Sequence, residues 1–133
     1  RWNRASYRRY THVKVKLMNK LLMSLIATVV INIFVWIQMN GQFIKDAPSW
    51  LSSKFLILGM GAPLGLGFWY ATRWSYEHFG YTWGYRLTGF GLGTIVFGIM
   101  SWLILDEIPT LKTIISLMLA AAIILIQISN VIE

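Results

Sequence analysis

Four long apolar segments constrain the fold of this chain more than any other feature. They cover about residues 21–39, 52–76, 85–105 and 111–132. A helix needs about 20 apolar residues to cross the hydrocarbon core of a bilayer. The apolar residues do not alternate with polar ones, as they would in a transmembrane β-barrel. We therefore predict an all-α, polytopic membrane protein whose four transmembrane helices form a compact bundle.

The composition agrees with a membrane protein. Hydrophobic residues make up 56% of the chain and charged residues only 13%, against about 25% charged residues in a typical soluble domain. A soluble chain of 133 residues could not bury that much apolar surface in one core. Short connections between the segments predict that sequential helices are antiparallel neighbours. The first segment is too long for a signal peptide, so we expect it to be retained.

The basic residues predict the domain organisation and the orientation. Seven of the 12 Lys and Arg residues lie in the first 20 positions, so we divide the chain into a basic, aromatic arm (1–17) and a transmembrane domain (18–133). Arg73 and Arg86 fall on the same side as the arm, whereas Lys45, Lys54 and Lys112 fall on the other. Nine cations against three place both termini in the cytoplasm. We expect a multi-pass protein of a bacterial inner membrane, a plasma membrane or an equivalent one.

The arm interleaves cations with aromatic rings, which suits an anionic headgroup layer. Docking on a neighbouring protein fits the same pattern, and we leave both open. We do not expect nucleic-acid binding from an arm tethered to a membrane. The candidate docking cations are Arg1, Arg4, Arg8, Arg9, Lys14 and Lys16.

Glycines in the second and third segments are spaced for close helix packing. Gly61 and Gly65 form a GxxxG pattern, as do Gly89 and Gly93, and such spacing lets helix backbones approach closely in lipid. Pro63 and Gly91 add sites where a helix can bend. The pattern fits either packing within the four helices or an interface with a second copy or another subunit.

Few polar side chains lie where a substrate path through the membrane would run. Asn32 and Gln127 are the deepest, and Glu77 lies near the cytoplasmic end of the second segment. They are our substrate-path candidates. Interhelical hydrogen bonds for the two amides, and an ion pair of Glu77 with Arg73 four residues earlier, are the structural alternatives.

Enzymatic chemistry is not indicated. The chain has no cysteine, so thiolate catalysis and cysteine-based metal sites are excluded. It also lacks the GxSxG, Walker and HExxH motifs. We expect no enzyme activity, no metal and no cofactor.

The four segments and several local motifs resemble the small multidrug resistance family within the drug/metabolite transporter superfamily. The likeness covers about residues 18–130. It is carried by Phe68-Trp69, by Gly91-Leu92-Gly93 ten residues before Ser101-Trp102, and by Leu105-Asp106-Glu107-Ile108-Pro109 ahead of the last helix. The resemblance implies a four-helix transporter fold.

Transporting members of that family carry a Glu in the first helix that protons and cationic substrates share. The corresponding stretch here, 27–32, contains no acid. The resemblance thus implies a small-solute transporter or half-transporter without that proton-coupling Glu, in an oligomer or with a heteromeric membrane partner. The alternative is a non-catalytic accessory or assembly subunit of a larger membrane complex. Membrane lipids are expected contacts under both hypotheses.

Overall fold

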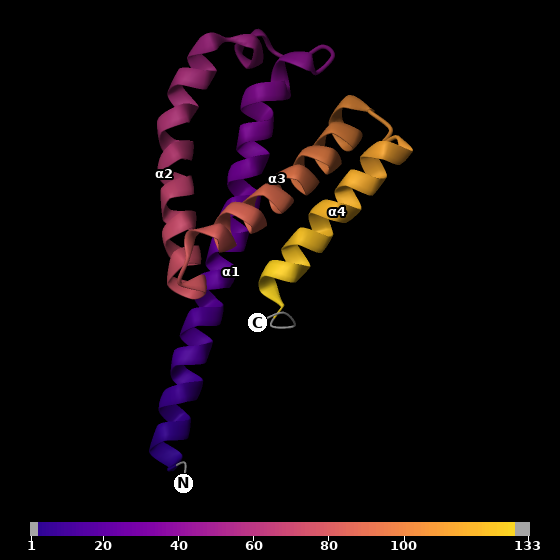
Figure 1. Ribbon diagram of the computed structural model, residues 1–133. Coiled ribbons are helices and arrows are strands. Elements are labelled where there is room, and N and C mark those ends of the chain that lie inside the picture. The colour runs from indigo at the N-terminus through magenta and orange to yellow at the C-terminus, as the bar shows by residue number, and fades with distance from the viewer. Residues whose placement is uncertain (1–2, 130–133) are drawn as a thin grey trace.

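The computed structural model describes residues 3–129, and every regular element in this range is helical (Figure 1). The four main helices are α1 (Arg4–Asn40), α2 (Lys54–Phe79), α3 (Thr82–Leu105) and α4 (Leu111–Ile128). Two short 3-10 turns, η1 (Gly41–Phe43) and η2 (Ser49–Ser52), lie between α1 and α2. All four helices are long and apolar enough to cross a membrane. This confirms the predicted all-α fold with four candidate spans.

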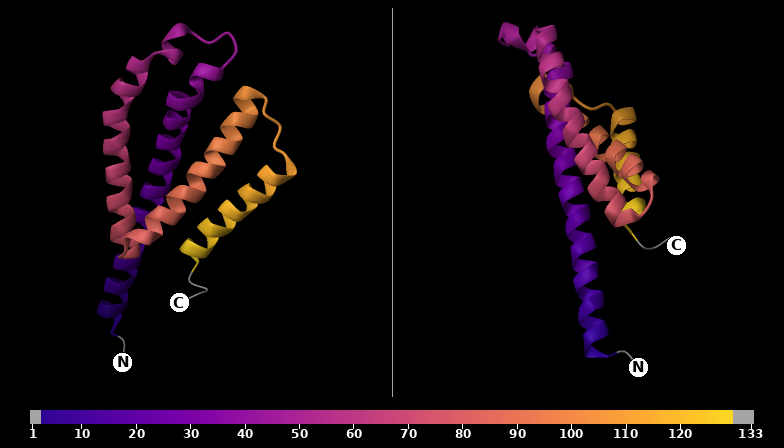
Figure 2. Two further views of the ribbon diagram at one scale, coloured as in Figure 1. Left: turned by 45° about the horizontal axis from the view of Figure 1, so that its top comes forward. Right: turned by 90° about the vertical axis from the view of Figure 1, so that its left-hand side faces the viewer.

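The arm and the first span form one continuous helix of 37 residues. Asn3 caps it, its side chain accepting from the amide of Ala5, and no break occurs at residue 17. A helix of this length measures about 55 Å, whereas the hydrocarbon core is about 30 Å thick. The N-terminal part of α1 accordingly projects well beyond the other helices (Figures 1 and 2).

Local capping residues explain where the other helices begin and end. Ser53 caps α2 and Thr110 caps α4, each accepting from a backbone amide in the first turn. Gly80 ends α2 in the left-handed region, with φ of 78°, which only glycine adopts without strain. Asp106 ends α3, as predicted for the Asp106–Pro109 turn. The predicted end of the fourth span, at 130–132, lies outside the described residues.

The helices are less compactly arranged than a closed four-helix bundle. α1 packs against α2 and α3, whereas α4 packs mainly against α3. In Figures 1 and 2, α4 lies on the side of α3 that faces away from α2. The reason lies in α3, whose glycines allow close approach on two faces: Gly93 meets α1, and Gly91 meets α4.

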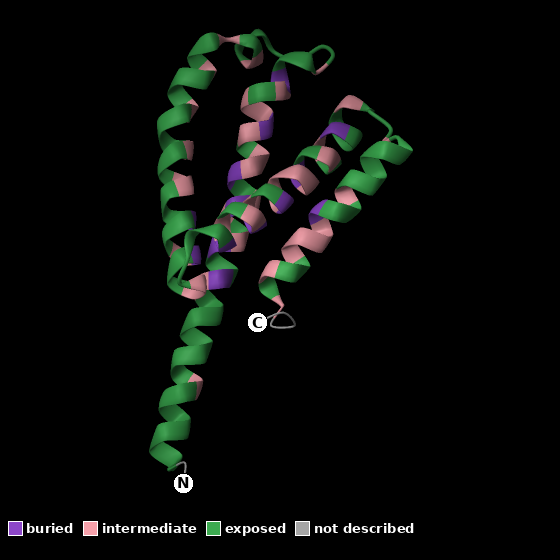
Figure 3. Cartoon of the chain, viewed as in Figure 1, coloured by how far each residue is buried: buried purple, intermediate pink, exposed green. Residues whose placement is uncertain are grey.

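Most of the apolar surface points outward. The solvent-accessible area is 10086 Å², whereas a compact soluble protein of this mass exposes about 7,100 Å². The buried residues are mostly small or polar, and they gather where α1 crosses α2 and α3 (Figure 3). Large aliphatic side chains outside and small polar ones inside is the pattern expected of helices packed in lipid.

Candidate functional site: a cavity at the junction of three helices

A polar stripe runs along α1 and faces the helix junction. Ser24, Thr28, Asn32 and Trp36 are spaced four residues apart, so they lie on one side of the helix. Ser24, Thr28 and Trp36 are each no more than 2% exposed. Each of the four makes a hydrogen bond. The stripe therefore forms the seam along which α2 and α3 join α1.

Ser24 connects α1 to α2. Its hydroxyl donates to the carbonyl oxygen of Ala71 at 2.8 Å in a buried position. Ala71 is fully buried, which lets the two backbones approach closely. Nearby on α2, Ser75 is buried and its hydroxyl oxygen has no partner among the described residues. The crossing of α1 and α2 is thus built from side chains no larger than a serine.

Thr28 and Asn32 line the next turns of the seam toward α3. Thr28 donates to the carbonyl oxygen of Ser24 at 2.7 Å, and its Oγ1 lies 3.3 Å from the hydroxyl of Tyr85 on α3. The Asn32 Nδ2 donates to the carbonyl oxygen of Thr28 at 2.8 Å. A Cβ placed on Gly93 would lie 2.9 Å from the Asn32 Oδ1. The Asn32 amide is therefore held between its own helix and α3.

Trp36 closes the seam at its outer end. Its indole Nε1 donates to the hydroxyl of Ser101 on α3 at 3.0 Å. Trp36 is the largest of the fully buried side chains. Because a buried indole N–H needs a partner, this bond specifies which face of α3 packs on α1.

A cavity of about 860 Å³ opens beside the seam, between α1, α2 and α3. α3 supplies eight of its eleven lining residues. Their positions along α3 repeat every three or four residues from 82 to 97, so they form one continuous helix face. The lining residues are Asn32, Phe68, Thr72, Thr82, Tyr85, Arg86, Gly89, Phe90, Gly93, Thr94 and Phe97.

The cavity wall combines aromatic rings with hydrogen-bonding groups. Hydroxyls, one amide and one guanidinium lie among four aromatic residues, and Arg86 is the only charged side chain in the lining. Binding sites for small molecules have this mixture of apolar walls and a few polar groups. A second cavity, of about 480 Å³, lies on the opposite face of α1 and has no charged lining residue.

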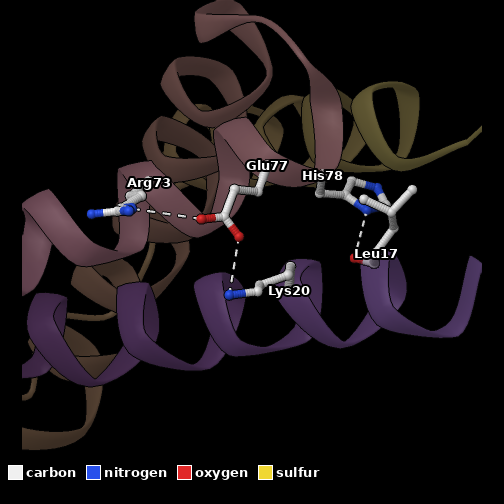
Figure 4. Close-up of polar contacts among 5 residues, drawn as sticks. All are labelled: Leu17, Lys20, Arg73, Glu77 and His78. Atoms are coloured by element: carbon white, nitrogen blue, oxygen red, sulfur yellow. Dashed lines mark hydrogen bonds and ion pairs between the residues drawn. The ribbon is translucent and has the colours of Figure 1, made fainter. Parts of the chain in front are cut away.

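An ion cluster joins α1 and α2 at the inner ends of the helices (Figure 4). The Glu77 carboxylate lies 3.0 Å from the Lys20 ammonium and 3.6 Å from the Arg73 guanidinium. The predicted pair of Glu77 and Arg73 is therefore present, and Lys20 is the nearer partner. His78 adds a hydrogen bond from its Nδ1 to the carbonyl oxygen of Leu17 at 2.8 Å. Both contacts tie α2 to α1 and leave Glu77 outside the cavity.

The three substrate-path candidates do not come together. Asn32 lines the cavity, whereas Gln127 and Glu77 do not. Gln127 lies on α4, which packs on a different face of α3. Its side chain makes no hydrogen bond to any residue between 3 and 129. The structure thus supports Asn32 alone as a residue of a polar path.

The two GxxxG patterns have different environments. Gly61 and Gly65 have open space where a Cβ would lie, although both are on the bowed helix α2 (Figure 1). Gly89 meets only the ring of Tyr85 on its own helix. In the second pattern Gly93 alone contacts another helix, and Gly91 contacts α4. α2 remains helical through Pro63, so the predicted bend there does not interrupt the helix.

The candidate docking cations lie on the projecting part of α1. The side chains of Arg4, Arg8, Arg9, Lys14 and Lys16 are all exposed. Arg1 lies outside the described residues.

Sequence reasoning missed the cavity-lining role of Arg86, which it counted only for the orientation. The hydroxyls of Thr72, Thr82 and Thr94 were missed as well. The spacing of Thr82, Arg86 and Thr94 along one helix face was a usable signal. It was weak because α3 has small or apolar residues on its other faces too.

No protein-family model, curated protein or solved structure matches this chain.

Proposed function

We propose that this chain is a subunit of a small-solute membrane carrier, with a four-helix plan like that of small multidrug resistance proteins and without a proton-coupling Glu in its first helix. The cavity between α1, α2 and α3 is its substrate path. The observation that carries the proposal is the cavity's size and lining. Its volume of about 860 Å³ falls within the range of about 300–1,000 Å³ that is usual for small-molecule sites.

The carrier would work as an oligomer. No residue of α4 lines the cavity, so its open side has no cover from the described part of the chain. The face of α2 that bears Gly61 and Gly65 is also uncovered, and it suits close approach of another helix. A second copy or another small chain is the partner that we propose.

The orientation also belongs to this proposal. Nine Lys and Arg residues against three favour cytoplasmic termini, in a bacterial inner membrane, a plasma membrane or an equivalent one. A bias of this size disfavours insertion in both orientations, and with it an antiparallel homodimer. The oligomer would then be a parallel one, or a pair with a similar chain of opposite orientation.

Proton coupling through α1 is not part of the proposed mechanism. Thr28 and Asn32 occupy the inward face of α1 where the resembling transporters have an acid. An amide forms hydrogen bonds but does not titrate. Asn32 would contact a neutral or polar part of the solute while Arg86 contributes the only lining charge.

Thiol accessibility tests whether the cavity is a water-filled path. The chain has no native cysteine, so single cysteines can be placed without background. Phe97 and Ile99 on α3 are similarly exposed, at 51% and 47%, but only Phe97 lines the cavity. With a membrane-impermeant maleimide applied to sealed vesicles, we expect Phe97→Cys to be labelled at least tenfold faster than Ile99→Cys, because thiols react as thiolates in water.

Equal and negligible labelling at both positions would contradict a substrate path, because it would place lipid or protein in the cavity. Labelling of Phe97→Cys from both sides of the membrane would show that the path opens alternately. The unreacted protein is run on a sizing column in each case, so that misfolding is not read as accessibility.

A second candidate function is that of an accessory subunit, and the projecting part of α1 favours it. From Leu17 back to Arg4 the helix extends about 20 Å, whereas each headgroup layer is only about 5–7 Å thick. Tyr7 and Val13, which are 64% and 54% exposed, would then stand beyond the lipid. A partner protein would cover these apolar side chains.

Removing residues 1–16 tests the accessory role. Leu17 is kept because its carbonyl oxygen accepts the bond from His78. The truncated chain is expected to keep its thermal stability and to lose fixed-stoichiometry association with other chains in gently extracted native membranes. The matched control replaces Lys45 and Lys54, cations at the opposite end, with Gln. Unchanged association after truncation would exclude docking through the arm.

A further inference from the structure

We infer that the cavity binds an anionic amphipath, with the anionic group at Arg86 and the apolar part along Phe90 and Phe97. This inference rests on the proposed function, because it assigns a ligand class to the same cavity. The ligand's anionic group is of the phosphate or carboxylate type. The ligand is a lipid rather than a water-soluble organic phosphate.

The charge of the cavity is the first argument. Arg86 is the only charged lining residue, and it makes no ion pair with any residue between 3 and 129. The nearest acid along the chain, Glu77, is occupied by Lys20 and Arg73. A cationic solute would therefore meet repulsion and no carboxylate, whereas a guanidinium binds a phosphate or carboxylate through two parallel hydrogen bonds.

The order of the lining residues along α3 is the second argument. Thr82 and Arg86 belong to the first turns of α3, next to the α2–α3 connection. Phe90 and Phe97 follow one and three turns deeper. The lined face from Thr82 to Phe97 is about 22 Å long. Such a length suits an elongated molecule better than a small polar solute.

The cavity therefore repeats the polarity profile of one bilayer leaflet. A cation and hydroxyls lie where headgroups lie, and aromatic rings lie at acyl-chain depth. Thr72 and Thr82 stand near the cationic end and offer oxygen atoms to a headgroup, although the Thr72 hydroxyl already donates to the carbonyl oxygen of Phe68. A molecule with one anionic head and an apolar chain satisfies both ends at once.

Binding of defined probes to the full chain tests this inference. Three probes separate the two parts of the ligand: dioleoyl phosphatidic acid, dioleoylglycerol with the same chains and no charge, and glycerol 3-phosphate with the charge and no chains. Binding to purified protein in neutral detergent is followed by native mass spectrometry. We expect one tightly bound phosphatidic acid per chain, and at least tenfold weaker binding of the other two probes.

Variants locate the binding to the cavity. Arg86→Gln is expected to weaken phosphatidic acid binding at least tenfold. The matched control is Arg73→Gln, which removes a cation from the same end of the bundle but outside the cavity and is expected to change the affinity less than threefold. Phosphatidic acid is also expected to protect Phe97→Cys from the maleimide.

The outcomes separate the inference from the proposed function. Equal weakening by Arg86→Gln and Arg73→Gln would overturn the inference, since it would indicate a general surface attraction. Equal binding of dioleoylglycerol or of glycerol 3-phosphate would overturn it too, because charge or chain would then be dispensable. If Phe97→Cys is labelled but phosphatidic acid does not bind, the path stands and the ligand class is wrong. If Phe97→Cys is not labelled, the path itself is wrong.

Discussion

Replacement of Trp36 by alanine is expected to lower the free energy of unfolding by about 3–5 kcal/mol. The Trp36 side chain is 2% exposed, and its indole N–H donates to Ser101, which is itself 5% exposed. The substitution leaves a cavity between α1 and α3 and removes the donor from a buried hydroxyl. Total stabilities of proteins are about 5–15 kcal/mol, so this one change removes a large part.

The measurement is unfolding in mixed detergent micelles by increasing denaturing detergent, followed by helical circular dichroism. Trp102→Ala is the matched control, because Trp102 adjoins Ser101 but is 52% exposed. We expect it to cost less than about 1 kcal/mol. Trp36→Phe separates the ring from its N–H and should cost about 1 kcal/mol. Similar losses for the two alanine variants would show that Trp36 does not hold α1 to α3.

Replacement of Gly91 by leucine is expected to detach α4 from α3. Even a Cβ at this position would lie 2.6 Å from the side chain of Ile124 and 2.9 Å from the backbone oxygen of Ala120. Side chains can rotate away, but a backbone oxygen in a helix cannot. Overpacking typically costs about 1–3 kcal/mol, and a leucine exceeds what one methyl group would displace. Separation of α4 should appear as faster amide exchange and earlier proteolysis of 106–128.

Gly65→Leu is the control for Gly91→Leu, because a Cβ at Gly65 meets nothing within 4 Å. It is expected to leave the fold of the single chain intact, and removal of a helical glycine favours the helix by roughly 0.5–1 kcal/mol. If Gly65→Leu instead lowers the native mass of the assembly without unfolding it, this face of α2 is an interface between subunits. Equal detachment of α4 in both variants would exclude the packing described for Gly91.

The four helices could be predicted because each one reports its environment locally. The transfer free energy of a 20-residue apolar segment decides whether it spans, and no other part of the chain is needed for that. The same holds for the ends at Gly80 and Asp106, where turn chemistry is written in a few neighbouring residues. The ion pair of Glu77 with Arg73 was also predictable, since residues four apart share a helix face.

The packing of the helices could not be predicted in the same way. Lipid is as apolar as leucine, so no hydrophobic pattern marks which face of a spanning helix is inside. Gly61–Gly65 and Gly89–Gly93 have the same spacing, yet only Gly93 contacts another helix. The continuity of α1 across residue 17 was missed too, because a run of cations was taken as the boundary of a separate arm.

The amino-acid sequence thus determined that the chain is helical, how many helices could span a membrane, and how the basic residues are distributed along it, because these depend on local composition. The tertiary contacts decided that α4 lies outside the α1–α3 junction, that Glu77 joins helices rather than lining the cavity, and that Arg86 and Asn32 share one cavity. These outcomes depend on how closely two backbones can approach, as at Ala71 and Gly93, and that distance is set by both helices together.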